Sequence, residues 1–116
     1  MVKGGDEKVF IDLLSEQPIS HNLEIKKRVL FQSDEIPHIT QYAQTKLQPG
    51  QVATGHAHSD MWEIFLCIEG RGVIKVDGQA IKLEAGVCVL VEPGEVHEIE
   101  NTSYRPLVLN TLGVVE

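Results

Sequence analysis

The sequence has 116 residues, of which 42% are hydrophobic and 23% are charged. This length fits one domain with one hydrophobic core, and the composition is that of a globular protein rather than a disordered chain. Asp and Glu number 17 against 10 Lys and Arg, and the resulting net charge of −7 argues against binding to nucleic acid or to an anionic membrane.

The N-terminal sequence, MVKGGDEKVF, lacks the pattern of a signal peptide, because its single early Lys is followed by small and acidic residues instead of an apolar stretch. No apolar run approaches the roughly 18 residues that a membrane-spanning helix needs. We therefore expect a cytoplasmic protein. In that reducing compartment, Cys67 and Cys88 are expected to be buried thiols and not a disulfide.

The first half of the chain gives the weaker structural signals. Apolar residues between positions 6 and 15 have helical spacing, but positions 9–14 fit a strand equally well, so both alternatives stay open. Hydrophobic and polar residues alternate at the start of 23–31 and along 40–47, which predicts two strands. We assign residues 1–35 to an N-terminal extension, formed by an outer strand or a short helix, and residues 36–116 to a β-barrel.

Glycine and proline punctuate the second half regularly and separate short apolar runs at 64–68, 73–76, 79–83, 87–91 and 107–112. Asp77 and Gly78 lie between two of these runs and predict a type I′ hairpin, in which both central residues have positive φ. The unbroken run at 64–68 is compatible with a strand that is covered on both faces. Short strands at this spacing predict an all-β sandwich or barrel.

Three of the five histidines fall in two clusters with possible metal chemistry. His56 and His58 are two residues apart and would share one face of a strand. Glu63 follows a turn-like Ser-Asp pair that can bring its carboxylate back beside them, and His97 follows a Pro-Gly turn. Imidazole and carboxylate donors together suit Fe, Mn, Zn, Ni or Cu.

Each residue alone has an ordinary explanation, because a single His is more often a surface or core residue than a metal ligand. Only the combination of four donors favours a metal site over these ordinary explanations. The other two histidines, His21 and His38, lie next to proline-containing loop sequences and are expected to be exposed without a special role.

At the clustered residues the sequence resembles the cupin superfamily. The first cupin motif, G-x5-H-x-H-x4-E-x6-G, is matched by Gly50, His56, His58, Glu63 and Gly70. The second, G-x5-P-x-G-x2-H-x3-N, is matched by Gly86, Gly94, His97 and Asn101. Glu92 stands where the family usually has the first proline, which affects the rigidity of this turn and not the ligand set.

The resemblance implies a jelly-roll barrel, also called a double-stranded β-helix, of six to eight strands around a pocket. It implies that His56, His58, Glu63 and His97 bind one divalent transition metal, namely Fe, Mn, Zn or Ni. It further implies a homodimer with a small-molecule ligand or substrate inside each barrel. Inward alternation would place Phe65 and Cys67 in the pocket with Glu63.

Two functions follow from such a site. The first is a small metal-dependent enzyme of the dioxygenase, isomerase or epimerase, or lyase type, acting on a polar small molecule. The alternative is a non-catalytic small-molecule-binding or sensing module. Tyr42, Gln44 and Lys46 are the candidate acid–base groups if their face of the strand looks into the barrel, although ordinary strand packing is the better explanation for each of them.

Overall fold

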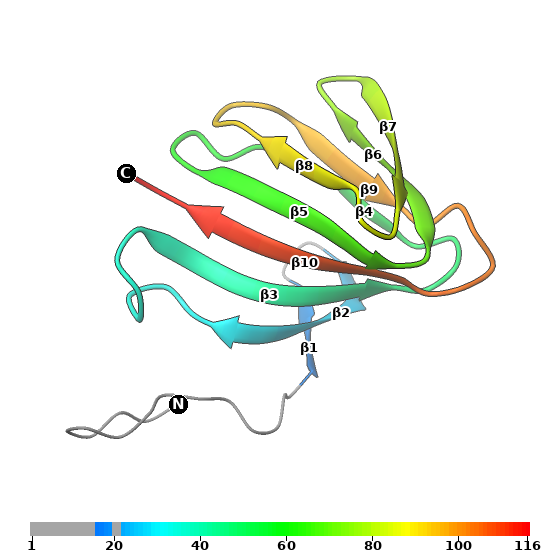
Figure 1. Cartoon of the computed structure of the whole chain (residues 1–116), viewed down its shortest axis with the longest axis horizontal. Helices are drawn as coiled ribbons and strands as arrows, with labels where there is room; N and C mark the ends of the chain where they lie inside the picture. The colour runs from blue at the N-terminus through cyan, green and yellow to red at the C-terminus, as the bar shows by residue number, and fades with distance from the viewer. Residues whose placement is uncertain (1–15, 20–21) are drawn as a thin grey trace.

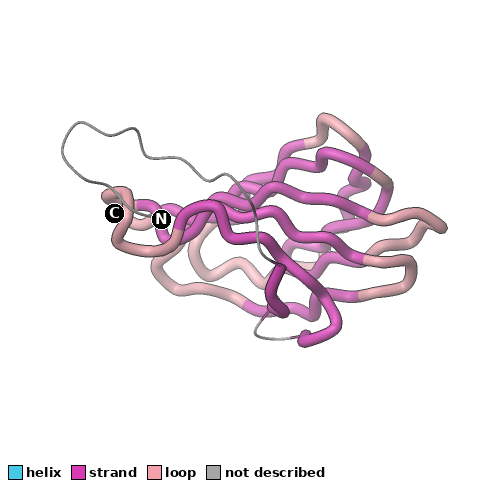
Figure 2. The backbone as a smooth tube through the Cα atoms, turned by 90° about the horizontal axis from the view of Figure 1, so that it is seen from below, coloured by secondary structure: helices cyan, strands magenta, loops and turns pink. Residues whose placement is uncertain are grey.

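The computed structural model describes residues 16–19 and 22–116, and within this part all regular secondary structure is β-strand (Figure 2). No helix of the described residues has the length and apolar character needed to cross a membrane. The strands are β1 (Glu16–Ile19), β2 (Asn22–Phe31), β3 (Ile39–Leu47), β4 (Val52–His56), β5 (Trp62–Glu69), β6 (Arg71–Val76), β7 (Gln79–Glu84), β8 (Cys88–Val91), β9 (His97–Glu100) and β10 (Leu107–Val114).

The strands form two antiparallel sheets that pack face to face (Figure 1). One sheet has six strands in the order β1-β2-β3-β10-β5-β8, and the other has four in the order β4-β9-β6-β7. The chain crosses between the sheets several times, so strands adjacent in a sheet are mostly not adjacent in sequence. This is the jelly-roll arrangement of an all-β protein, as the sequence predicts.

The core lies between the two sheets because alternate residues of each strand point inward. On β5 the inward residues are Glu63, Phe65 and Cys67, all of them buried. Ile74 on β6 and Leu83 on β7 contribute buried side chains from the other sheet. Among the described residues, the core therefore contains one acidic residue, Glu63, whose inward neighbours on β5 are apolar.

The apolar run at 64–68 is not covered on both faces by the described chain. Ile64 and Leu66 are half-buried and Ile68 is exposed, because they lie on the outer face of the six-stranded sheet. A continuous apolar run therefore misleads here: only alternate residues of β5 enter the core.

The other local predictions can be compared with the strands directly. β2 and β3 confirm the strands expected at 23–31 and 40–47. Asp77 and Gly78 have φ values of 47° and 83°, which confirms the hairpin with positive φ at both positions. The helix-or-strand alternative at 6–15 lies outside the described residues. The boundary proposed after residue 35 falls in the β2–β3 connection and stays a prediction.

Candidate metal centre

Three of the four predicted ligands are brought to one end of the barrel by three different strands. His56 is the last residue of β4, Glu63 is the second residue of β5, and His97 is the first residue of β9. β4 and β9 are hydrogen-bonded neighbours, with His56 and His97 directly opposite each other. Glu63 reaches the same point from the facing sheet.

The donor atoms of these residues form a compact group. One ligand atom each of His56, Glu63 and His97 lies within 4.8 Å of the others. His97 Nε2 is 3.3 Å from Glu63 Oε1, and the rings of His56 and His97 have centroids 4.4 Å apart. Residues separated by up to 41 positions in the sequence thus present nitrogen and oxygen donors to one small volume.

His58 lies at the rim of this group, in the connection between β4 and β5. Its Nε2 is 3.5 Å from Glu63 Oε1, and its side chain is 40% exposed, whereas that of His97 is 2% exposed. The His58 ring lies 4.9 Å from that of His56 and 6.4 Å from that of His97. The structure therefore brings all four residues together, with His58 on the solvent side.

The electrostatics of Glu63 are those of a carboxylate held away from water. Burial raises the pKa of Glu63, while the nearby imidazoles of His58 and His56 act in the opposite direction. An ionised carboxylate in an apolar core is costly unless a cation or several hydrogen bonds compensate it. A divalent ion among Glu63 and the imidazoles would supply that compensation, so the donor set fits a transition metal.

The floor below the centre is apolar. The ring of Phe65 packs against that of His97, with 5.4 Å between the centroids. Phe65 itself is 5% exposed, so water reaches the centre from the rim and not through the core. Such a floor keeps the dielectric low around the charged donors and strengthens their interaction with a bound cation.

The turn before His97 keeps its shape without the usual proline. The backbone N–H of Glu92 donates to Glu95 Oε1 at 2.7 Å, using a proton that a proline would lack. Gly94, at a φ of 84°, donates its N–H to the carbonyl of His58 at 2.8 Å. This hydrogen bond ties the two motifs together and holds His58 beside the centre.

Asn101, the last residue of the second motif, has a structural role at the other end of the barrel. Its Nδ2 donates to the carbonyls of Leu47 and Arg105 at 2.9 and 2.7 Å, and its Oδ1 accepts from the N–H and Oγ of Ser103. These bonds fix the connection between β9 and β10.

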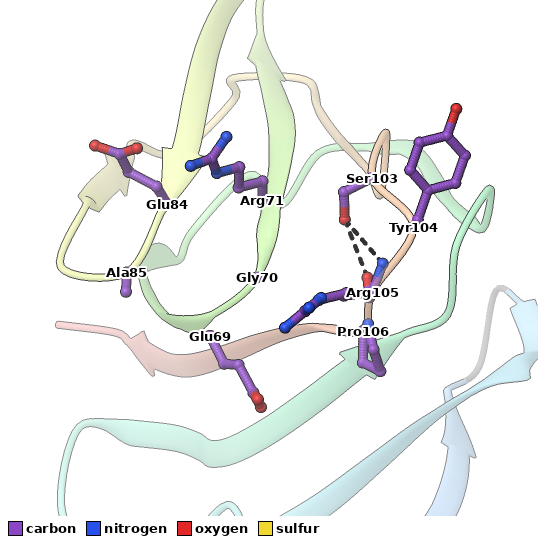
Figure 3. A pocket seen from close by; sticks show the side chains of 9 residues that line it. All are labelled: Glu69, Gly70, Arg71, Glu84, Ala85, Ser103, Tyr104, Arg105 and Pro106. Atoms are coloured by element: carbon purple, nitrogen blue, oxygen red, sulfur yellow. Dashed lines mark hydrogen bonds between the residues drawn. The ribbon is translucent and has the colours of Figure 1, made fainter.

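That connection borders a hollow of about 850 Å³, into which Figure 3 shows Arg71 and Arg105 projecting. Glu69, another lining residue, is the last residue of β5 and stands six positions beyond Glu63. At the rise of an extended strand, this separation is roughly 20 Å. The hollow is therefore distinct from the candidate metal centre.

The expected acid–base candidates lie on the wrong face of β3. Ala43 and Leu47 are buried in the core, so the inward residues of β3 are the odd-numbered ones. Tyr42, Gln44 and Lys46 point outward, where Gln44 Nε2 donates to Asn110 Oδ1 at 3.1 Å. The sequence shows that polar and apolar residues alternate along β3. Which of the two sets points inward depends on which face of the strand packs against the core.

The two cysteines and the two remaining histidines agree with the sequence-based expectations only in part. Both cysteines are free, as expected, but only Cys67 is buried, whereas Cys88 lies exposed on the outer face. Burial raises the pKa of Cys67, whose Sγ lies near the carbonyls of residues 69 and 70 and not near the metal donors. His38 is exposed, as predicted, and His21 lies outside the described residues.

The family is decided by comparison with known proteins. The sequence model of the Cupin domain matches residues 43–114, which is most of the chain and includes all four candidate ligands. The chain belongs to the cupin family. This confirms the resemblance seen in the two motifs.

Two curated proteins are similar to this chain over part of its length. The oxalate-binding protein of Thermotoga maritima is 36% identical over 66 residues, which cover 57% of this chain and 54% of the relative. The tetracenomycin polyketide synthase protein TcmJ of Streptomyces glaucescens is 34% identical over 61 residues, covering 53% of this chain and 41% of the relative. The chain thus matches about half of the length of these relatives.

Solved structures show the same fold at lower identity. A predicted oxalate decarboxylase from Thermotoga maritima superposes with a TM-score of 0.82 and 24% identity, covering 89% of this chain and 94% of that one. KdgF from a Halomonas species gives a TM-score of 0.73 at 17% identity, with 88% and 87% coverage. These likenesses support the double-stranded β-helix of this cupin.

Proposed function

We propose that this cupin is a small metal-dependent enzyme that acts on a small carboxylate inside its barrel. His56, His58, Glu63 and His97 would hold one divalent transition metal, which we take to be Fe, Mn, Zn or Ni. The observation that carries the proposal is the buried carboxylate of Glu63, which faces imidazoles of three histidines at the barrel end.

The arrangement favours a metal over a purely structural cluster. A carboxylate at 9% exposure on an otherwise apolar strand face destabilises the folded chain unless it gains a cation. The half-exposed His58 leaves the solvent side open, so four protein donors do not enclose the centre. Sites with an open coordination position are the catalytic kind, whereas closed sites are structural.

A bound divalent ion would act as a Lewis acid that polarises a carbonyl or carboxylate oxygen of the substrate. For this chemistry the protein would supply the positions of the donor atoms and an apolar surface beneath the metal that excludes water. Phe65 keeps water away from His97, and the hydrogen bond from Gly94 to the His58 carbonyl holds the rim. These features orient a small polar molecule between the donors and solvent.

The carboxylate class is supported by a relative. The curated Thermotoga maritima protein that shares 36% identity over 66 residues carries the name oxalate-binding protein. The matched region covers about half of that protein. A carboxylate ligand for this chain is therefore part of the proposal. A non-catalytic binding protein is the second candidate, and the name of that relative favours it.

Purified protein is expected to contain close to one transition-metal ion per chain. His97→Ala removes a donor from the buried part of the centre and should lower the metal content at least tenfold without unfolding the barrel. Elemental analysis of protein purified without chelator, together with a thermal melt, measures both effects.

His38→Asn is the matched control. His38 is exposed and has a φ of 71°, a conformation that Asn tolerates better than Ala. Its metal content should equal that of the wild type. Metal content that is unchanged in His97→Ala, or lowered equally in both variants, would count against the ligand assignment.

Metal-loaded wild type is expected to consume at least one small carboxylate, and His97→Ala should lose this turnover. A panel of oxalate, malonate and small keto acids, followed by proton and carbon NMR, measures substrate loss directly. Tight binding without any turnover across the panel would instead support the non-catalytic module.

We also keep the expectations of a homodimer, of a cytoplasmic location and of an N-terminal extension before residue 36 as proposals. The outer face of β5 supports an association between copies, since Ile68 is exposed and Ile64 and Leu66 are only half-buried there. Apolar side chains gathered on one open sheet face are typical of protein contacts.

A further inference from the structure

Basic residues gather at the end of the barrel opposite the candidate metal centre. Two hollows adjoin there and share Glu69 as a lining residue: the one of about 850 Å³ beside the β9–β10 connection, and a second of about 250 Å³ on the outer face of the six-stranded sheet. Six of the ten Lys and Arg residues of the chain line these hollows. Five of the six are exposed and are called the basic surface: Lys26, Arg28, Lys46, Arg71 and Arg105.

The basic surface differs in sign from the chain as a whole, whose net charge is −7. Glu69 and Glu84 also line the hollows, and Glu24 is exposed two residues before Lys26 on the same face of β2. The five exposed cations thus outnumber the carboxylates beside them, so the local charge is positive. A positive region on an acidic protein attracts anionic partners to that place alone.

The strand register aligns one part of the basic surface across the six-stranded sheet. Lys26 of β2 stands directly opposite Lys46 of β3, and Lys46 stands opposite Val108 of β10. Val108 in turn stands opposite Glu69 of β5. Both lysines lie on the outer face, since Ile25, next to Lys26, is completely buried. Like charges directly opposite each other destabilise a sheet, so a bound anion would remove a cost that the two lysines impose.

Arg71 and Arg105 continue the basic surface into the larger hollow, where Figure 3 shows both side chains. Among the described residues, neither guanidinium lies within 4.0 Å of a carboxylate, although Glu84 stands opposite Arg71 across β6 and β7. Figure 3 also shows the side chain of Glu69 pointing away from Arg71. A guanidinium binds a carboxylate through two parallel hydrogen bonds, and both groups are available for such a contact.

An exposed aromatic residue lies beside these arginines on a backbone that is held in place. Tyr104 is 99% exposed. The residues on either side of it are fixed by Asn101, whose Oδ1 accepts from the Ser103 N–H and whose Nδ2 donates to the Arg105 carbonyl. Tyr and Arg are the residue types that most often carry the binding energy of protein contacts. A Tyr also offers a large contact area while losing little conformational freedom.

The shape of the basic surface favours a polypeptide over a small anion. Its cations are exposed and belong to β2, β3, the start of β6 and the β9–β10 connection, so they do not converge on one point. Lys26 and Glu69 are three strand spacings apart, or roughly 14 Å. Alternate side chains of an extended peptide lie about 7 Å apart on one side, which lets several carboxylates meet cations along this line. The acidic remainder of the chain repels nucleic acid and anionic lipid, whose charges extend beyond the basic surface.

We propose that the basic surface, together with Tyr104, is a docking site for an acidic peptide segment of a partner protein. Carboxylates of the segment pair with Lys46, Arg71 and Arg105, and an apolar side chain of the segment packs on Tyr104. The docking site lies at the opposite end of the barrel from the candidate metal centre. It therefore requires neither a bound metal nor the proposed function.

The test is the fluorescence anisotropy of a labelled peptide in which Glu and Ser alternate around one central Phe. Wild type should bind this peptide at low ionic strength, and the affinity should fall several-fold at physiological ionic strength, because salt screens exposed ion pairs. Lys46→Glu and Arg105→Glu should each weaken binding about tenfold or more, since each reverses a charge at the contact. The same peptide with Gln in place of Glu should not bind measurably.

Lys75→Glu and Lys82→Glu are the matched controls, because both lysines are exposed on the other sheet and each substitution changes the net charge equally. Both variants should bind the peptide like the wild type. Equal weakening by these controls would show that only net charge matters and would overturn the docking site. The docking site is also overturned if wild type does not bind the acidic peptide, or if it binds single-stranded DNA or phosphatidylserine vesicles more tightly.

Two further measurements test for other occupants of the basic surface. Light scattering should give wild type and Lys46→Glu the same molar mass, whereas a mass that changes with this substitution would assign the surface to a second copy of the chain. Peptide binding that appears only when Asp6→Asn, Glu7→Gln and Asp12→Asn are introduced together would assign it to the chain's own N-terminal residues. Either result overturns docking of a partner protein.

The docking site and the proposed function fail separately. Peptide binding should be equal with and without Mn²⁺, whereas metal content and carboxylate turnover test the metal centre alone. Lys46→Glu should melt at or above the temperature of the wild type, because it replaces repulsion between Lys26 and Lys46 with attraction. Arg105→Glu changes an exposed side chain in a connection and provides a second variant that keeps the strands intact. Lost peptide binding in such folded variants reflects the basic surface and not unfolding.

Discussion

Glu63→Gln should lower the affinity for a divalent metal by about a hundredfold or more and, at the same time, stabilise the metal-free protein at neutral pH. The substitution keeps the size and shape of the side chain but replaces an anionic donor with a weak neutral one. Loss of an outer partner of a metal ligand typically costs 10–100-fold in affinity, and loss of a ligand costs at least as much. Titration with Mn²⁺ and Zn²⁺ measures this effect.

The stabilisation follows from the burial of Glu63. Its pKa is raised in the folded chain, mainly by desolvation, so the folded state holds a proton that the unfolded chain has already released. The metal-free wild type should therefore lose stability as the pH rises from the ordinary carboxyl range through the raised pKa of Glu63. Glu63→Gln has no such proton and should lack this part of the pH dependence.

Thermal melts of the metal-free proteins between about pH 4 and 8 test whether the stability of the wild type falls with rising pH and whether Glu63→Gln lacks this fall. Glu69→Gln is the matched control, because Glu69 is exposed at the other end of the same strand. It should follow the wild type in both metal affinity and pH dependence. A Glu63→Gln protein that melts below the wild type at neutral pH would show that the carboxylate is compensated within the protein itself and does not await a cation.

Asn101→Ala should destabilise the fold by roughly 3 kcal/mol without changing the metal donors. The side chain is 1% exposed and makes four hydrogen bonds, two as donor and two as acceptor. Its removal leaves the carbonyls of Leu47 and Arg105 without this partner, and each buried group that loses its partner costs about 1–3 kcal/mol. For a domain of this size, the melting temperature should fall by roughly 10 °C.

Asn110→Ala is the control for the loss of an asparagine. Asn110 is half-buried on the outer face, and within the described part of the chain its side chain bonds to the side chains of Gln44 and Tyr42. We expect it to cost less than about 1 kcal/mol, because solvent can replace these partners. Equal melting temperatures for the two variants would mean that the β9–β10 connection does not depend on Asn101.

The sequence by itself determined the class of the fold and singled out the four candidate metal donors. Glycine spacing and short apolar runs predict an all-β protein, because turns that need positive φ favour Gly and Asp, as at positions 77 and 78. The spacing of His56, His58, Glu63 and His97 carries the family motif without knowledge of the strands. Both signals depend only on neighbouring residues or on fixed spacings in the sequence, so they can be identified without a structure.

The tertiary structure decided which face of each strand meets the core. Alternation alone gives two equivalent faces, and the outward placement of Tyr42, Gln44 and Lys46 could be settled only by the packing of Ala43 and Leu47. The same ambiguity applies to β2, where the inward direction of Lys27 follows from its neighbour Ile25 and from its register with Thr45. A shift of one residue exchanges every side chain between pocket and solvent.

The structure also separated the roles within the motifs. Asn101 and His97 stand four positions apart in one motif, yet Asn101 fixes a connection at the far end of the barrel while His97 joins the donor group. Glu92 replaces a proline, and the N–H that it gains is bonded by Glu95. The sequence therefore determined which residues are the candidates for metal chemistry. Where these residues lie was decided only by the packing of the two sheets, which are built from distant parts of the chain. Burial and hydrogen-bond partners depend on contacts between such distant residues, and the spacing of residues in the sequence does not reveal those contacts.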